Sequence, residues 1–122
     1  MKTVFINLKE GEIIYFQKVS VNSIININSS FVDMSNHLNQ DELGALVQFE
    51  HNQPITILNL TDVTPYTLIF FDDELCFKGA SCSVKSGTGS FTIQTQYKNI
   101  LFVRMPHNLK LNQIISLRHE EH

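Results

Sequence analysis

The sequence contains no tryptophan, only two cysteines and three prolines, and only 17% of its 122 residues are charged. Two cysteines cannot build the disulfide framework of a small secreted protein, so we expect reduced thiols and a cytoplasmic location. No apolar run approaches the roughly 20 residues of a membrane-spanning helix. The first apolar stretch ends at Lys9 and Glu10, which is too early for a signal peptide. We therefore expect no membrane partner.

Positive charge is also scarce. The formal net charge is −3 and the pI is about 5.9. The basic residues are scattered singly along the chain instead of forming a patch or stripe. Because binding to a phosphate backbone depends on such a basic surface, we expect no nucleic-acid partner.

Apolar residues, by contrast, are plentiful: they make up 43% of the chain and include nine phenylalanines. A chain of this length and composition forms one domain around one hydrophobic core. We expect a single β-rich domain over residues 1–117. Residues 118–122 are charged or histidine and predict a flexible C-terminal tail.

Short apolar segments with a period of two recur along the chain and are separated by turn residues. The segment 100–105 is almost continuously apolar, which is typical of a strand covered on both faces. The predicted strands span residues 2–8, 12–19, 23–28, 44–49, 55–60, 66–71, 75–78, 81–85, 91–95, 100–105 and 114–117.

The period changes once, near residues 30–38. Ser30 begins a sequence of the capping-box type, and Phe31, Met34 and Leu38 recur at helical spacing, which predicts one short helix. Many short strands and one helix indicate a mostly β (β-rich α+β) fold. We expect a small barrel or sandwich of mainly antiparallel strands.

The order of several segments is typical of a known family. These segments are Gly44–Phe49, a proline-led strand at 65–72, and two closing strands at 103–106 and 109–115. Over roughly residues 20–117 the chain resembles the uncharacterised prokaryotic family known as domain of unknown function one-nine-two, as a divergent member. The family has Asp where this chain has Thr67, and Gly-Asp where it has Asn112 and Gln113. The resemblance implies the family's fold and no activity, because the family has none assigned.

Four residues are candidates for a ligand-binding site. His37, His51 and His107 each lie at the end of a predicted element, so they could converge at one rim of a barrel. Arg104 interrupts an apolar strand and must reach solvent, pair with a carboxylate or face a pocket, because unpaired burial of a charge is too costly.

Other polar clusters are interpreted as structural. The acidic run 72–74 lacks the alternate ligand spacing of a calcium loop and predicts a hairpin tip. His119 and His122 lie in the expected tail, so we expect no metal site there. Cys82 alternates with apolar residues and predicts a buried thiol, whereas Cys76 should be the more exposed one.

No motif of a protease, kinase, nucleotide-binding or dinucleotide-binding protein is present, and we expect no cofactor. The first hypothesis is a non-catalytic binding or protein-interaction module of the cytoplasm, whose partner is another protein, another copy of the chain or a small ligand. The alternative is a metal-dependent or hydrolytic enzyme. Its site would be assembled from the dispersed histidines, Arg104 and the acidic run.

Overall fold

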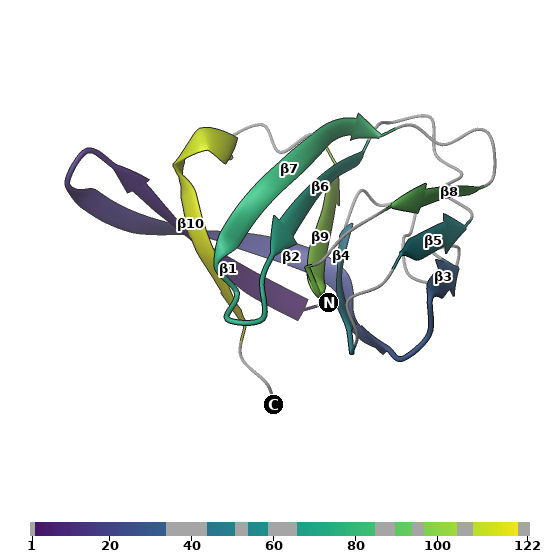
Figure 1. Ribbon diagram of the computed structural model, residues 1–122. Coiled ribbons are helices and arrows are strands. Elements are labelled where there is room, and N and C mark those ends of the chain that lie inside the picture. Colours follow the sequence, from purple (N-terminus) through teal and green to yellow (C-terminus); the bar gives the residue numbers. More distant parts are fainter. Residues whose placement is uncertain are drawn as a thin grey trace.

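The protein is described by a computed structural model that covers residues 2–33, 44–50, 54–58, 66–84, 90–93, 97–104 and 109–119 (Figure 1). Within these ranges the chain is almost entirely β-structure, with one short 3-10 helix at Leu111–Gln113. The strands are β1 (Lys2–Glu10), β2 (Ile13–Ile27), β3 (Phe31–Asp33), β4 (Gly44–Phe49), β5 (Ile55–Leu58), β6 (Tyr66–Phe71), β7 (Phe77–Val84), β8 (Ser90–Ile93), β9 (Asn99–Arg104) and β10 (Ile114–His119).

Seven of these strands form one strongly curved sheet in the order β10-β1-β2-β4-β9-β6-β7. All neighbours in it are antiparallel except β2 and β4, which are parallel. The two outer strands approach each other: Cys76 forms a β-bridge with Ser116, and the Leu117 N–H donates to the Leu75 carbonyl at 2.9 Å. The sheet is therefore a nearly closed barrel, which confirms the predicted mostly β fold.

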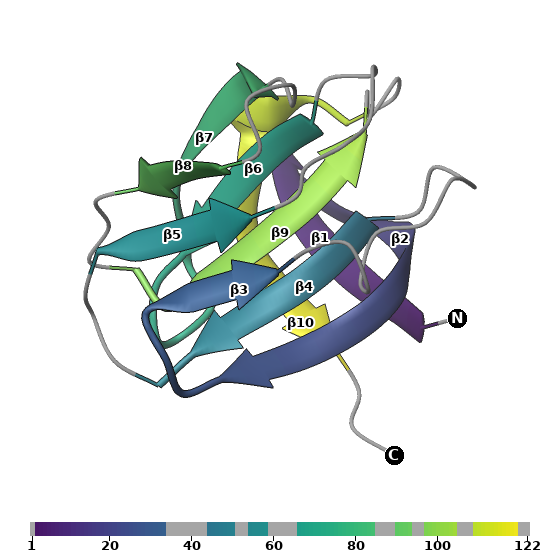
Figure 2. The same cartoon turned by 90° about the vertical axis from the view of Figure 1, so that its right-hand side faces the viewer.

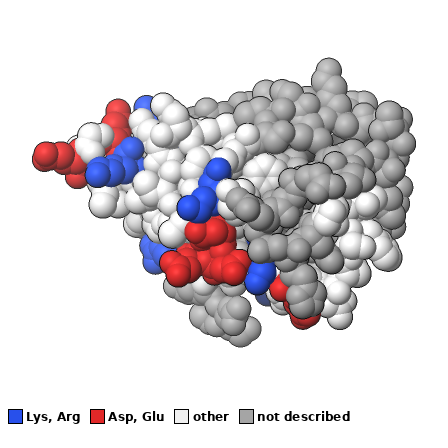
Figure 3. All heavy atoms as spheres, in the orientation of Figure 1, with Lys and Arg blue, Asp and Glu red and all other residues white. Residues whose placement is uncertain are grey.

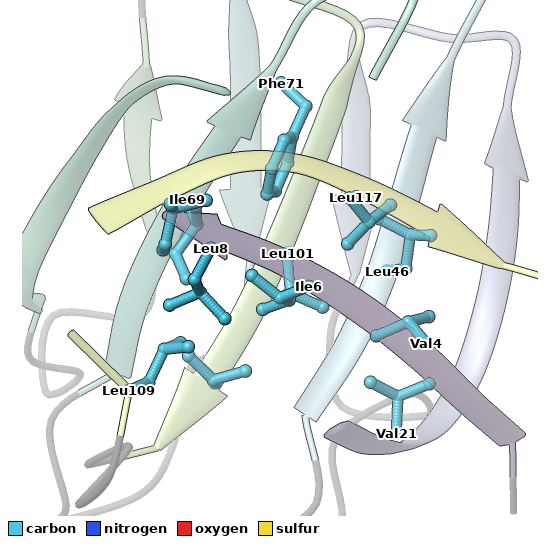
Figure 4. Packing of buried hydrophobic residues seen from close by; sticks show 12 residues of the cluster. Val4, Ile6, Leu8, Val21, Leu46, Ile69, Phe71, Leu101, Leu109 and Leu117 are labelled. Carbon is cyan, nitrogen blue, oxygen red and sulfur yellow. The ribbon is translucent and has the colours of Figure 1, made fainter. Parts of the chain in front are cut away.

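A second, three-stranded sheet in the order β3-β5-β8 lies over the outer face of the barrel at β4, β9 and β6 (Figure 2). The interior of the barrel holds one buried apolar cluster, in which Val4, Ile6 and Leu8 of β1 face residues of the opposite wall (Figure 4). A second cluster, which includes Val32 and Ile55, fills the space between the barrel and the small sheet.

The strands shared by both clusters are apolar on both faces. In β9, Leu101 and Val103 point into the barrel, while Ile100 and Phe102 point toward the small sheet. Asn99 is the buried polar residue at the start of this strand, and its side-chain amide donates to the Asp72 carbonyl at 2.9 Å. The prediction that the segment 100–105 is a strand is confirmed as far as Arg104, and residues 100–103 are covered on both faces; residue 105 is outside the described residues.

Four expectations from the sequence need correction. The segments 75–78 and 81–85 form one continuous strand, β7, which begins at Phe77 instead of Leu75. The segments 12–19 and 23–28 form one continuous strand, β2, which changes partner from β1 to β4 at Val21. Residues 31–33 are in strand β3 instead of the first turn of a helix, because they pair with β5; the rest of the expected helix is outside the described residues. The last strand, β10, extends to His119 instead of ending at residue 117.

Across the described ranges no helix is both long and apolar enough to span a membrane. The 3-10 helix has three residues and precedes β10 directly. Its position shows that the chain turns into the last strand by a single tight turn.

Gly44 lies where the backbone of β4 is in close contact with the backbone of β9. A Cβ atom at this position would lie 1.6 Å from the Phe102 carbonyl oxygen and 2.7 Å from its carbonyl carbon. Both are main-chain atoms, so the neighbouring strand cannot yield by rotating a side chain. Only glycine permits this contact.

We expect Gly44→Ala to lower the free energy of unfolding by about 3 kcal/mol or more, because the added methyl group must separate two central strands. Urea denaturation followed by circular dichroism measures the change. Gly11→Ala is the control: Gly11 has φ +61° and nothing within 4 Å of an added Cβ, so only the backbone cost of roughly 1–2 kcal/mol applies. Equal losses in the two variants would contradict the steric explanation.

Candidate interaction surface

Most residues of the predicted ligand-binding site lie outside the part of the chain that the structure describes. His37, His51 and His107 are outside the described residues, so their convergence stays a prediction. The backbone of Arg104 is described at the end of β9, opposite Tyr66 of β6, but its side chain is outside the described part of the structure.

The acidic run lies far from Arg104. Asn99 pairs with Phe71 at one end of the β6–β9 ladder, and Arg104 pairs with Tyr66 at the other end. Five residues of strand separate these ends by about 17 Å. Asp72 follows Phe71 directly, so the backbone geometry does not bring the acidic run and Arg104 into one site.

The acidic run is a hairpin tip, as predicted. The carboxylate oxygen Asp72 Oδ1 accepts hydrogen bonds from the backbone N–H groups of Glu74 and Cys76, each at 2.9 Å. Leu75 has a φ of +64°, a conformation rarely adopted by non-glycine residues, and its N–H donates to the Asp72 carbonyl at 2.9 Å. Asp72 therefore stabilises the turn that joins β6 to β7.

Lysines flank this turn. Lys78 Nζ lies 3.6 Å from Asp72 Oδ2, and Lys98 Nζ lies 3.3 Å from Asp73 Oδ2. Figure 3 shows the acidic residues as one red patch bordered by blue groups. In the described part of the chain, no three His, Cys, Asp or Glu side chains are placed to hold a metal ion. The carboxylates of Asp72 and Asp73 thus interact with backbone N–H groups of the turn and with two lysines.

The pKa of Asp72 is lowered below its ordinary value of 3.8, first by the hydrogen bond from the Cys76 N–H. Desolvation opposes this effect, and the Glu74 N–H and Lys78 reinforce it. A carboxylate with a lowered folded-state pKa contributes stability above its unfolded-state pKa, and this contribution is lost as pH falls through the folded-state value. Asp72 should therefore contribute to acid sensitivity of the fold.

We expect Asp72→Asn to flatten the dependence of Tm on pH below about pH 4, because the variant has no carboxylate to protonate. Thermal melts between pH 7 and pH 2 measure this dependence. Glu74→Gln is the control, since it removes the same charge from the same turn but keeps the acceptor for the two backbone N–H groups. Parallel profiles for wild type and Asp72→Asn would refute the role of this carboxylate.

The structure tests the predicted exposure of Cys76 and the predicted C-terminal tail. Cys76 is exposed and not in a disulfide, as expected, whereas the Cys82 side chain is outside the described part. His119 belongs to β10, where it pairs with Val4, and not to a tail; its Nδ1 is buried without a hydrogen-bond partner among the described residues. His122 is outside the described residues, so the expectation that His119 and His122 form no metal site stays a prediction.

β1 and β2 form a hairpin, in agreement with the predicted strands 2–8 and 12–19. The sequence analysis missed that the end of this hairpin, residues 9–18, projects from the barrel (Figure 1); we call this end the projecting hairpin. Its tip is the two-residue turn of Gly11 and Glu12, and the positive φ of Gly11 fits the first position of a type II′ turn. β10 pairs with β1 only as far as Leu8, so the hairpin extends beyond the barrel.

The projecting hairpin exposes large apolar side chains. Ile13, Ile14 and Phe16 are 69%, 65% and 53% exposed, respectively. Figure 3 shows charged residues of both signs at the end of the hairpin and uncharged surface behind them. Apolar groups gathered in this way on a protruding element are typical of a contact surface.

Arg118 stabilises the base of this surface. The rings of Phe5 and Phe16 meet edge to face, with centroids 5.8 Å apart and an interplanar angle of 70°. The Arg118 guanidinium carbon lies 4.7 Å from the Phe5 centroid and 5.4 Å from the Phe16 centroid. Three strands therefore contribute to one aromatic–cation cluster, which orients Phe16 at the root of the projecting hairpin.

We expect Arg118→Met to lower the free energy of unfolding by about 0.5–1 kcal/mol, because it keeps the aliphatic stem but removes the cation above two rings. A double-mutant cycle with Phe5→Leu, measured by urea denaturation, should give a coupling energy of about 0.5 kcal/mol or more between the two positions. If the losses of stability in Arg118→Met and Phe5→Leu simply add in the double variant, the guanidinium does not stabilise the fold through the Phe5 ring.

One edge of the projecting hairpin is also unpaired among the described strands. β2 pairs with β1 from Ile13 to Val21 and with β4 only from Val21 onward. The opposite edge of β2 before Val21 therefore carries backbone N–H and C=O groups that no described strand satisfies. An edge of this kind is a template for pairing with another strand.

Comparison with known proteins identifies the fold. The structure is similar over 98% of the chain to a protein of Sinorhizobium meliloti 1021 provisionally described as a transcription regulator, with a TM-score of 0.60, 11% identity and 94% coverage of that chain. It is also similar to a protein of unknown function from Novosphingobium aromaticivorans, with a TM-score of 0.57, 10% identity, and coverage of 95% of this chain and 84% of that one.

No family model and no curated protein matches the chain. The resemblance to the domain of unknown function one-nine-two therefore stays a prediction. The two structural neighbours support the fold alone, because their sequences are only 10–11% identical to this one.

Proposed function

We propose that the protein is a non-catalytic protein-interaction module of the cytoplasm and that its contact surface is the projecting hairpin. The observation that carries the proposal is the exposure of Ile13, Ile14 and Phe16, each more than half exposed, on one element that extends from the barrel. Burying such side chains against a partner removes apolar surface from water, at about 25 cal/mol per Å².

The residues around these side chains support the proposal. Lys9, Glu10, Glu12 and Lys18 are all exposed on the same hairpin and border the apolar side chains. Protein interfaces commonly combine an apolar centre with a polar rim that fixes orientation. The aromatic–cation cluster adds rigidity at the base, which lowers the entropy lost when a partner binds.

A direct role in DNA binding receives little support. The first structural neighbour is provisionally described as a transcription regulator, but this chain has a net charge of −3 and no basic stripe in its sequence. If this chain acts in regulation, contact with another protein fits its surface better than contact with a phosphate backbone.

The proposal predicts that Ile14→Lys reduces partner binding about tenfold or more, because the substitution places a charge at the centre of the apolar surface. Affinity-tagged wild type and variant are produced in cells, and the proteins retained by each are quantified by mass spectrometry. Phe31→Lys is the matched control: Phe31 is 54% exposed but lies on β3 in the small sheet, away from the projecting hairpin.

Retention of the same proteins by wild type, Ile14→Lys and Phe31→Lys would refute the proposed surface. Unchanged Tm values verify that each variant is folded, since surface substitutions of this kind usually change stability by no more than about 0.5 kcal/mol.

A further inference from the structure

We propose that the partner of the projecting hairpin is a second copy of this chain, joined by antiparallel pairing of the free β2 edges with Tyr15 at the two-fold axis. This inference rests on the proposed function and names the partner of the same surface. The pairing places Ile14 of each copy opposite Phe16 of the other, and Glu12 opposite Lys18.

The backbone pattern determines which residues are available at the edge. Glu10 and Ile13 close the two-residue turn and face each other across it, so they form a hydrogen-bonded pair. Because such pairs alternate along an antiparallel ladder, the odd-numbered residues of β2 bond to β1. The N–H and C=O groups of Ile14, Phe16 and Lys18 therefore point to the free edge.

Symmetry restricts the registers that two identical edges can form. An antiparallel pair of identical strands must bring edge-facing residues of one copy opposite edge-facing residues of the other. Centring the axis on Phe16 would place Ile14 opposite Lys18, and centring it on Gln17 would place Phe16 opposite Lys18. Centring it on Tyr15 places apolar residues opposite each other.

Charge selects the same register. Glu12 and Lys18 are each three positions from Tyr15, so this pairing brings an acidic and a basic side chain together twice, once on each side of the axis. Both residues are exposed, and no described ion pair uses either one. Opposite charges across neighbouring strands stabilise the pairing, and like charges destabilise it.

The shape of the molecule permits this arrangement. The projecting hairpin extends away from the barrel (Figure 1), so two antiparallel hairpins place the two barrels at opposite ends of the shared ladder. Ile14 of one copy would then contact Phe16 of the other, next to the aromatic–cation cluster. Each partner covers the edge of β2 that no described strand of the other copy pairs with.

The test uses charge exchange between the two positions. Glu12→Lys gives copies with lysine at both positions, and Lys18→Glu gives copies with glutamate at both. Each variant alone should have a dimer dissociation constant about tenfold or more above that of the wild type, because two favourable pairs become repulsive. An equimolar mixture of the two variants should recover the wild-type affinity, since every contact in the mixed dimer again joins opposite charges.

Sedimentation velocity over a concentration series measures these constants. We expect a weak dimer, with a dissociation constant between about 10 μM and 1 mM, because one hairpin per copy buries less than the ~800 Å² per partner of a stable interface. The double variant Glu12→Lys with Lys18→Glu should dimerise like the wild type. Ile14→Lys should abolish dimerisation, and Phe31→Lys should leave it unchanged.

A wild-type protein that stays monomeric up to about 1 mM overturns the inference, as does a dimer that is insensitive to both single charge changes. The two assays together distinguish failure of the dimer from failure of the proposed interaction surface. If the wild type is monomeric but Ile14→Lys still loses a captured protein other than this chain, the interaction surface stands and the second copy does not. If Ile14→Lys loses nothing in either assay, both are wrong.

Discussion

The constraint on which the rest of the structure depends is that β4, β9 and β6 are covered on both faces. Their side chains alternate between the barrel interior and the layer beneath the small sheet, so almost every position in them must be apolar. Gly44 allows β4 and β9 to approach closely, and Asn99 is tolerated because its amide bonds to a carbonyl. β1, β10 and the first half of β2 contribute side chains to the barrel cluster alone, and they can therefore carry polar and exposed residues on their outer faces.

Much of this fold follows from local sequence. The bounds of β4 and β6 agree with the predicted segments, because both are apolar runs ended by turn or polar residues. The errors occur where a tertiary partner outweighs a local pattern. Residues 31–33 pair with β5 although a helical spacing begins at Phe31. β2 continues through Asn22 and Ser23 because pairing with β4 begins at Val21, where pairing with β1 ends.

The candidate surface was harder to predict because exposure is a property of the assembled sheet. Four successive large residues, Ile13, Ile14, Tyr15 and Phe16, suggest a strand that is apolar on both faces and so buried. Tyr15 is indeed packed against the barrel core and donates a hydrogen bond to Gln113. Ile14 and Phe16 alternate with Tyr15 and therefore lie on the outer face of the sheet, where the cluster beneath the small sheet contains no residue of β2 before Ile25. Ile13 pairs with Glu10, beyond the last residue of β1 that pairs with β10. A useful signal in the sequence is the position of this run immediately after a tight glycine turn.

The pairing of β1 with β10 has a consequence for how the chain reaches its folded state. Asn7 and Ser116 are 109 positions apart in sequence, yet their side chains are joined by a hydrogen bond of 2.9 Å. During synthesis this edge of β1 stays unpaired until β10 has emerged from the ribosome, and contacts between such distant segments slow folding. β1 and β10 run side by side with Lys2 and His119 at the same end of their ladder. A short peptide could therefore join these two residues, and the segment between them could be opened at another loop with the same architecture. The backbone from Lys2 to His119 thus returns to the place where it started.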